Sequence, residues 1–189
     1  IYNHSSRFFP QWNYRCGEQV TGLLQLVQYV SSRGAKIWCE IGSNIGESAL
    51  IISSFNETEK LYCIDPLWNE IQYNQFLIRT RHLRHKIKLY RLKSSQAYEK
   101  FENNSIDAIY IDGGHTYNDI SSDLNFALSV VKNKGFICGH DYSNSFPDVK
   151  KAVDEFISTH QLPNPITFCD SSFVIGLSLI HISEPTRRY

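Results

Sequence analysis

Long apolar runs, an excess of one charge and paired cysteine motifs are all absent from this 189-residue chain. No apolar run approaches the ~20 residues that cross a bilayer, and nothing reads as a secretory signal, so we expect no membrane partner. The 19 basic and 19 acidic side chains cancel, which argues against a general attraction to nucleic acid. The five cysteines form no C-x-x-C pair, which predicts buried reduced thiols in a cytoplasmic protein.

Two phosphate-binding motifs are also missing from the most distinctive stretch of the chain, IWCEIGSNIGESAL at residues 37–50. A short apolar strand is followed here by a turn between Gly42 and Gly46, and then by a helix. The dinucleotide motif G-x-G-x-x-G needs a glycine where Asn44 stands, and the P-loop needs a lysine where Glu47 stands. A carboxylate in the first helical turn would also repel a triphosphate. The turn therefore predicts a small ligand without a polyphosphate group, with an ordinary strand-to-helix turn as the alternative.

Methionine is absent as well, so we expect that Ile1 is not the natural start of the protein. Residues 1–176 are predicted to form one domain, because a chain of this length ordinarily folds as one unit. Residues 177–187, LSLIHISEPTR, resemble a translated sequencing adapter, and we expect residues 177–189 to be a non-native tail. A genuine polar tail with a turn at Pro185 is the alternative.

Strand-like and helix-like apolar patterns alternate along the chain and end in a hairpin, which predicts an α/β doubly wound fold. The first helix is expected to pack on the sheet, and Lys134 and Gly135 to end the fourth. The predicted strands are residues 37–41, 61–64, 87–92, 106–112, 136–139, 166–169 and 173–176. The predicted helices are residues 17–33, 47–55, 71–85, 118–131 and 147–159.

Two charged features each have a functional and a purely structural interpretation. Asp65 ends the second predicted strand 19 positions after Gly46, close to the spacing at which an acidic residue binds ribose hydroxyls in nucleotide folds. A turn that begins at Asp65 and Pro66 is the alternative. Lysines and arginines crowd residues 79–93 and suggest a surface for an anionic substrate or RNA, but aromatic side chains do not alternate with them as base stacking requires. We therefore interpret this segment as a solvated face.

The second half of the chain has the most specific pattern. I-D-x-x-x-I-D-G-x-H-x-Y runs from Ile106, a helix with Asp123 and Leu124 follows, and G-x-x-x-G-H-D-Y runs from Gly135. Together with E-x-G-x-x-x-G at Glu40, this pattern resembles the class I S-adenosylmethionine (SAM) dependent methyltransferases of small molecules. That group includes sugar and antibiotic O-methyltransferases and, more distantly, catechol O-methyltransferases. The resemblance implies a Rossmann-like, seven-stranded sheet of order 3-2-1-4-5-7-6, with strand 7 antiparallel and SAM at the carboxyl ends of strands 1 to 4.

The resemblance also implies roles for single residues in SAM binding. The methionine end of SAM would be held by Glu40, Gly42, Ser43 and Gly46. Asp65 would bind the ribose, Ser95 would border the adenine, and Asp112 would lie beside the methyl group. The residue at Ser94 is often acidic in the family, so this sequence departs from the family pattern at the adenine.

A metal site is implied at the ends of the fourth and fifth strands. Catechol-type enzymes hold a divalent cation there with two aspartates and an asparagine, which correspond to Asp112, Asp141 and Tyr142. In antibiotic-type relatives the residue at His140 is an acidic ligand. Asp112, His140 and Asp141 are therefore the predicted ligands of Mg²⁺, Mn²⁺ or Fe²⁺, and whether the chain uses a metal is left open.

His115 stands three positions after Asp112, where catechol-type enzymes have their catalytic lysine. An imidazole is suited to removing the acceptor's proton, so His115 and Asp112 are the predicted catalytic residues. We expect a SAM-dependent methyltransferase that acts on a hydroxyl of a sugar, nucleotide sugar or other small polar metabolite. The alternatives are an RNA or protein methyltransferase that uses residues 79–93, or a catalytically silent SAM-binding domain. A homodimer is one possible assembly, and the sequence leaves the oligomeric state open.

Overall fold

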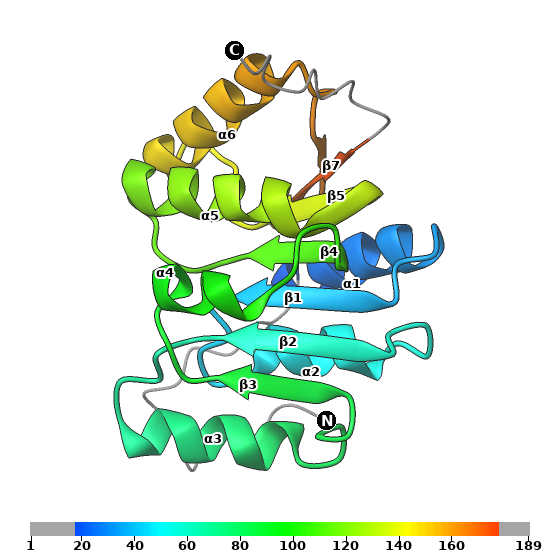
Figure 1. Ribbon diagram of the computed structural model, residues 1–189, viewed down its shortest axis with the longest axis vertical. Helices are drawn as coiled ribbons and strands as arrows, with labels where there is room; N and C mark the ends of the chain where they lie inside the picture. Colours follow the sequence, from blue (N-terminus) through cyan, green and yellow to red (C-terminus); the bar gives the residue numbers. More distant parts are fainter. Residues whose placement is uncertain (1–17, 178–189) are drawn as a thin grey trace, which may run out of the picture.

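The computed structural model describes residues 18–177, which form a mixed sheet of seven strands covered by helices (Figure 1). The strand order is β3-β2-β1-β4-β5-β7-β6, and β7 runs antiparallel to both β5 and β6. The predicted fold class and strand order are therefore confirmed. The strands are β1 (Ile37–Ile41), β2 (Lys60–Ile64), β3 (Ile87–Tyr90), β4 (Ile106–Ile111), β5 (Val131–Gly139), β6 (Ile166–Thr167) and β7 (Phe173–Gly176). The helices are α1 (Glu18–Ser31), α2 (Glu47–Ser54), α3 (Glu70–Thr80), α4 (Ser94–Ala97), the 3-10 turn η2 (Tyr98–Lys100), α5 (Tyr117–Val130) and α6 (Pro147–His160).

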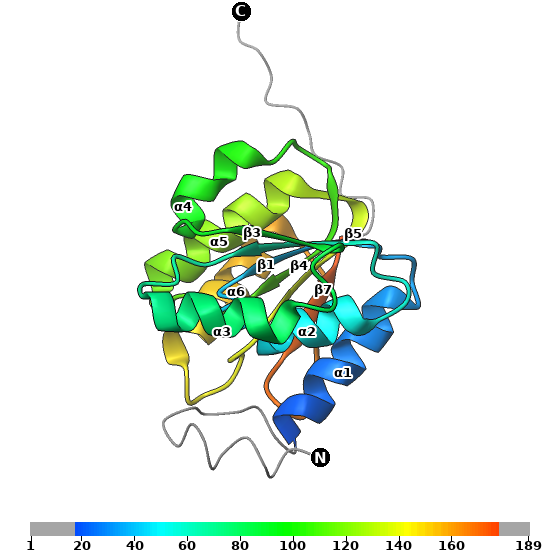
Figure 2. The same ribbon diagram turned by 90° about the horizontal axis from the view of Figure 1, so that it is seen from below.

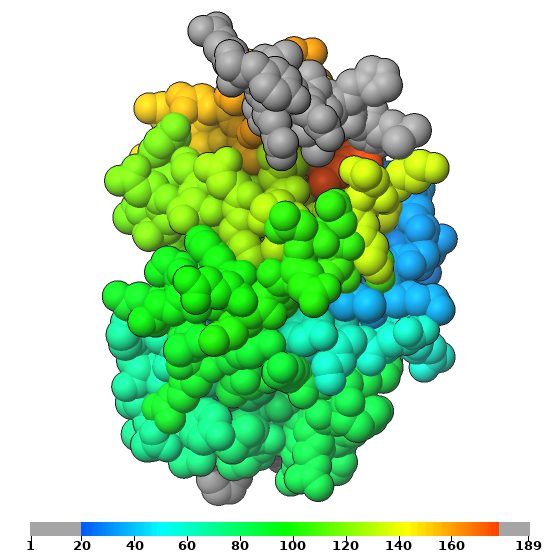
Figure 3. Space-filling model, viewed as in Figure 1, coloured from blue at the N-terminus to red at the C-terminus, as the bar shows by residue number. Residues whose placement is uncertain are grey.

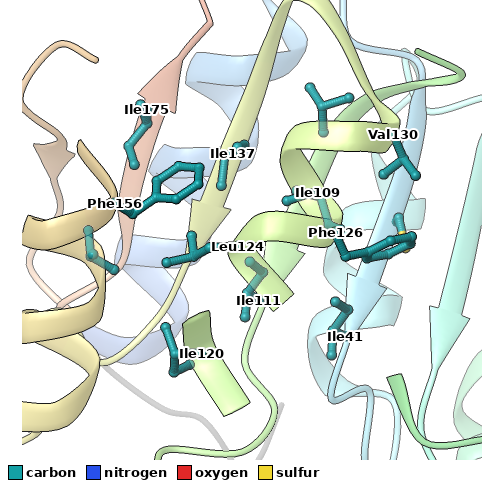
Figure 4. Close-up of a cluster of buried hydrophobic side chains, with 14 of the residues drawn as sticks. Ile41, Ile109, Ile111, Ile120, Leu124, Phe126, Val130, Ile137, Phe156 and Ile175 are labelled. Carbon is teal, nitrogen blue, oxygen red and sulfur yellow. The ribbon is translucent and has the colours of Figure 1, made fainter. Parts of the chain in front are cut away.

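Helices cover both faces of the sheet (Figure 2): α1, α2 and α3 lie on one face, and α4, α5 and α6 on the other. The long helices α5 and α6 each bury one stripe of side chains at three- and four-residue spacing, as Ile120 and Leu124 of α5 illustrate. These two pack with Ile109 of β4 and Ile137 of β5 in one core (Figure 4). A second core on the other face surrounds Trp38. Burial on both faces explains why the central strands are almost continuously apolar.

The structure corrects the predicted end of the third helix. The pattern predicted a helix to residue 85, but α3 ends at Thr80 and residues 81–86 form turns before β3. The backbone N–H of Leu83 donates to the Thr80 carbonyl, and that of Lys86 donates to the Leu83 carbonyl. These short-range bonds replace the helical ladder, so the basic residues after Thr80 lie in a turn.

The connection between α5 and β5 is a second correction. Lys134 and Gly135 do not end the helix, because α5 stops at Val130 and β5 begins at the next residue. Lys134 has a positive φ of 69° within the strand, and its N–H donates to the Leu177 carbonyl at 2.7 Å. A Cβ at Gly135 would lie 2.6 Å from the Asp107 carbonyl oxygen, so β5 approaches β4 too closely here for a side chain.

The register of the central strands determines which residues meet at the edge of the sheet. Ile41, the last residue of β1, pairs with Ile64 in β2 and with Ile111 in β4. Since these strands are parallel and their arrowheads point the same way in Figure 1, the residues that follow them emerge together. The register therefore brings Gly42, Asp65 and Asp112 to one edge. Among residues 18–177, no helix is long and apolar enough to span a bilayer.

Candidate functional site

A cavity of about 640 Å³ lies at this edge of the sheet. Its volume is in the range of small-molecule sites. The strand ends of β1, β2 and β4, the segment after β3 and the first half of α5 supply its walls. It is lined by Ile41, Gly42, Asn44, Ile64, Asp65, Pro66, Trp68, Gln72, Lys93, Ser94, Ser95, Asp112, Gly113, Gly114, His115, Asp119, Ser122 and Asp123.

Gly42 lets two strand ends come into contact. Its φ is +89°, and a Cβ there would lie 2.1 Å from the Asp112 carbonyl oxygen and 2.7 Å from the Cα of Gly113. Its N–H donates to the Ile64 carbonyl at 2.9 Å. The turn after β1 is thus held against both β2 and β4 by the absence of a side chain.

Three of the predicted SAM-binding residues lie outside the cavity lining. Glu40 is fully buried, and the Cys63 thiol donates to its Oε2 across 3.6 Å. Ser43 is only 2% exposed, and Gly46 takes the left-handed conformation at the start of α2. Gly42 and Asn44 form the surface of the turn that faces the cavity. Glu40, Ser43 and Gly46 support that surface from within the fold.

The Asp65 carboxylate connects two turns that border the cavity. Its Oδ2 accepts the N–H of Asn44 at 2.8 Å, and its Oδ1 accepts the N–H of Leu67 at 2.7 Å. A carboxylate has about four acceptor positions, so two remain for a ligand. Asp65 can therefore both order the turn after β1 and bind hydroxyl groups.

His115 and Asp141 form the shortest ionisable pair at the site. His115 Nε2 lies 2.7 Å from Asp141 Oδ2, and His140 Nδ1 lies 2.9 Å from Asp141 Oδ1. Burial favours the neutral form of Asp141, but the bonds and charges of His140 and His115 outweigh burial and lower its pKa. Asp141 also has a positive φ of 62°, a backbone conformation that is uncommon outside glycine and tends to occur at functional sites.

The structure groups possible metal ligands differently from the prediction. The ligand atoms of Asp112, His115 and Asp141 lie within 4.8 Å of one another. His140 also contacts two members of this group: its Nδ1 is 2.9 Å from Asp141 Oδ1 and 3.9 Å from Asp112 Oδ1, while its Nε2 is 3.9 Å from Asp170 Oδ2. The predicted set of Asp112, His140 and Asp141 thus shares two members with the set that the geometry brings together.

Sequence reasoning gave no role to several residues that line the cavity, and Asp123 is the clearest case. Its carboxylate is on the cavity wall although the residue is only 2% exposed, and Tyr98 donates to its Oδ1 at 2.8 Å. A signal was present in the sequence. Asp123 lies three positions after Ile120 and one before Leu124, so it is a charged residue in the buried stripe of α5. Trp68, also on the wall, had no comparable signal, and Lys93 was noted only as the last residue of the basic segment 79–93.

Comparison with known families identifies the group to which the chain belongs. The model of a methyltransferase domain family, Methyltransf_24, matches residues 39–142, which is more than half of the chain. The chain belongs to this methyltransferase family. The matched segment runs from β1 past Asp141 and so includes every predicted site residue. The predicted methyltransferase is confirmed by this match.

Solved structures with the same fold include several O-methyltransferases. A putative caffeoyl-CoA O-methyltransferase from Staphylococcus aureus superposes with a TM-score of 0.71 at 14% identity, covering 94% of this chain and 92% of that one. TomG from Streptomyces achromogenes, an O-methyltransferase of tomaymycin synthesis solved with SAM, gives 0.68 at 13% identity, covering 92% and 85%. An O-methyltransferase from Bacillus cereus solved with S-adenosylhomocysteine (SAH) gives 0.69 at 13% identity, covering 92% and 86%. At these identities the likeness shows the fold. A comparison with curated proteins found no match by sequence.

Proposed function

We propose that this methyltransferase takes its methyl group from SAM and transfers it to a hydroxyl of a small polar metabolite, such as a sugar, a nucleotide sugar or a natural product. One observation carries the proposal: a single cavity is lined by the Gly42 turn, by Asp65, and by Asp112 and His115. A surface suited to a donor molecule and a candidate base thus border the same space. Methyl transfer needs such an arrangement, because it depends on aligning two bound reactants.

The residues of the cavity fit SAM, which has a ribose diol and an amino acid end but no phosphate. Asp65 would accept the ribose hydroxyls with its two remaining acceptor positions. The turn at Gly42 and Asn44 would hold the amino acid end, with Glu40, Ser43 and Gly46 supporting the turn. Ser95 would border the adenine ring. Bound there, SAM supplies a methyl group on a sulfonium, and Asp112 would lie beside it.

His115 would remove the acceptor's proton with the help of Asp141. Since the pKa of Asp141 is lowered, this carboxylate is ionised at neutral pH and accepts a hydrogen bond from the Nε2–H of His115. That bond selects the tautomer in which Nδ1 is unprotonated, so Nδ1 would take the proton from the hydroxyl. Asp112 would orient the hydroxyl, and His140 would keep Asp141 in position.

A divalent cation at the same residues is the alternative arrangement. Asp112, His115 and Asp141 offer two carboxylates and an imidazole, a donor set that suits Mn²⁺ or Fe²⁺ better than Mg²⁺. Such a cation would orient the acceptor oxygen and favour its deprotonation. His115 would then be a ligand and not the base, so the two arrangements exclude each other. Dialysis against EDTA distinguishes the two arrangements. If the site holds a metal, turnover should be lost and Mn²⁺ should restore it. Unchanged turnover would exclude the metal and leave His115 as the base.

An RNA or protein acceptor bound by residues 79–93 is the competing substrate class. The contacts of the basic side chains favour the small molecule. Arg79 lies 3.4 Å from Glu47, and Lys86 donates to the carbonyls of Ser53 and Phe55. Arg91 likewise donates to the Leu67 carbonyl. These side chains tie α3 and β3 to the rest of the domain. RNA binding that falls steeply with salt would favour the alternative.

Calorimetric titration with SAM and SAH tests the donor, and absence of binding at millimolar ligand would overturn the proposal. The base is tested by His115→Ala, with His82→Ala, an exposed histidine within residues 79–93, as the matched control. We expect His115→Ala to lower kcat about 10²- to 10⁴-fold while SAH binding changes little. His82→Ala should retain the full rate. The reverse result would favour the basic segment, and SAH binding without transfer to any of a panel of acceptors would favour a silent binding domain.

A further inference from the structure

Asp123 is a buried carboxylate on the wall of the cavity, outside the group around His115. It lies in the middle of α5 and is 2% exposed. Tyr98 donates to its Oδ1 at 2.8 Å, and the nearby Ser94 side chain also favours the charged form of the carboxylate. A Cβ at Gly113 would lie 3.8 Å from Asp123 Oδ2, so this oxygen is next to the end of β4. The carboxylate thus joins α4, β4 and α5 at one wall of the cavity.

Structural support alone does not explain a carboxylate at this position. Burial raises the pKa of Asp123 because it disfavours the charged carboxylate, and the like charge of Asp119 acts in the same direction. Only the neutral hydroxyls of Tyr98 and Ser94 oppose this shift. An amide or a hydroxyl could join Tyr98 and Ser94 at lower cost. A buried carboxylate that borders a cavity is suited to a ligand that presents N–H donors to it.

The location of Asp123 indicates which part of the ligand it meets. Asp65 would hold the ribose, and Asp112 and His115 border the reacting groups, which leaves the wall formed by α4 and α5 for the base. Figures 1 and 3 show α4 lying against α5 at this edge. Adenine presents a 6-amino group with two N–H donors. Ser94 is a weaker acceptor than a carboxylate, but α5 brings the carboxylate of Asp123 to the same wall of the cavity.

We propose that Asp123 accepts a hydrogen bond from the 6-amino group of the adenine ring and so makes the site specific for adenosine over 6-oxo purines. The inference rests on the proposed SAM function and adds a specificity-determining residue to it. A 6-oxo ring would place a carbonyl oxygen against the carboxylate, which leaves two acceptors facing each other. A site built around a buried hydrogen bond rejects such an analogue strongly.

Binding of SAH and of S-inosylhomocysteine, its 6-oxo analogue, to the full chain tests the proposal by calorimetry. The wild-type protein should bind SAH about 10- to 100-fold more tightly than the analogue. Asp123→Asn should lose most of this preference or reverse it, because the amide N–H₂ can donate to the 6-oxo group. Asp154→Asn on the surface of α6 is the matched control and should keep the wild-type ratio.

The outcomes separate this proposal from the proposed function. If the wild-type protein binds SAH but does not prefer it to the 6-oxo analogue, the role of Asp123 is wrong and the SAM function stands. The same holds if a folded Asp123→Asn variant keeps the wild-type ratio. If the wild-type protein binds neither ligand, both proposals fail. A wild-type protein without this preference overturns the role of Asp123 even if the variant does not fold, and a folded variant with a purely structural defect would keep the wild-type ratio.

Discussion

Replacing Gly42 with alanine should damage both the fold and the cavity. The added Cβ would lie 2.1 Å from the Asp112 carbonyl oxygen and 2.5 Å from its carbonyl carbon. Both partners are backbone atoms at the end of β4, so they cannot rotate away as a side chain could. The end of β4 would have to shift, and with it the Asp112 side chain and Gly113 on the cavity wall.

Gly34 provides a matched control for the size of this effect. Gly34 and Gly42 have nearly the same positive φ, +95° and +89°, but a Cβ at Gly34 would meet nothing within 4 Å. Gly34→Ala therefore carries only the conformational cost of a positive φ, about 1–2 kcal/mol. Gly42→Ala adds the cost of overpacking, about 1–3 kcal/mol. The sum, about 2–5 kcal/mol, is a large part of the ~5–15 kcal/mol that stabilises a typical domain.

Urea unfolding followed by circular dichroism, together with SAH titration, measures both consequences. We expect Gly42→Ala to lower the free energy of unfolding by about 1–3 kcal/mol more than Gly34→Ala does. SAH binding should weaken for Gly42→Ala and remain for Gly34→Ala. Equal destabilisation by the two substitutions would contradict this prediction, because it would mean that the ends of β1 and β4 are too far apart for a clash.

The pH dependence of stability and the reactivity of the cysteines give two further predictions. Burial works against the charge of Asp107, but hydrogen bonds from Lys132, Ile37 and Lys36 outweigh it and lower its pKa below the ordinary 3.8. The stabilisation by the Asp107 carboxylate is therefore complete above pH 3.8 and is lost as the pH falls through the lower pKa of the folded protein. Urea midpoints measured from pH 5 to about pH 2.5 should fall less for Asp107→Asn than for the wild-type protein. Parallel profiles for the two proteins would contradict this prediction. Burial raises the pKa of the Cys39, Cys63 and Cys138 thiols, whereas Cys169 is exposed. Mass mapping after iodoacetamide treatment should find Cys169 modified in the native protein, and the three buried thiols modified only after unfolding. Rapid labelling of Cys63 in the native protein would contradict the burial of the central strands.

Local patterns were enough to predict the main elements. The strand at Ile37–Ile41 and the turn between two glycines follow from a short apolar run and from the conformational freedom of glycine. The order of the strands came from the resemblance to methyltransferases, since alternation of strands and helices permits several orders. Of the predicted tail at residues 177–189, Leu177 is buried and its N–H donates to the Gly135 carbonyl of β5. Residues 178–189 lie outside the described residues.

Element ends were less predictable because they depend on contacts made elsewhere in the fold. The basic residues after Thr80 continue a helical pattern, yet turn hydrogen bonds end α3 there. Lys134 and Gly135 read as a helix end, but close approach of Gly135 to the Asp107 carbonyl places them in a strand. Neither contact can be predicted from the adjacent residues in the sequence.

Local sequence was enough to indicate the class of the site: a glycine turn without phosphate motifs, followed by acidic strand ends. It did so because strand ends and tight turns have residue requirements that act over a few positions. Tertiary packing was needed to bring His115 to Asp141, in addition to His140, and to place Asp123 beside the cavity. His115 and Asp141 are 26 positions apart in the sequence and meet at 2.7 Å, because the packing of β4, β5 and α5 brings the ends of the two strands together.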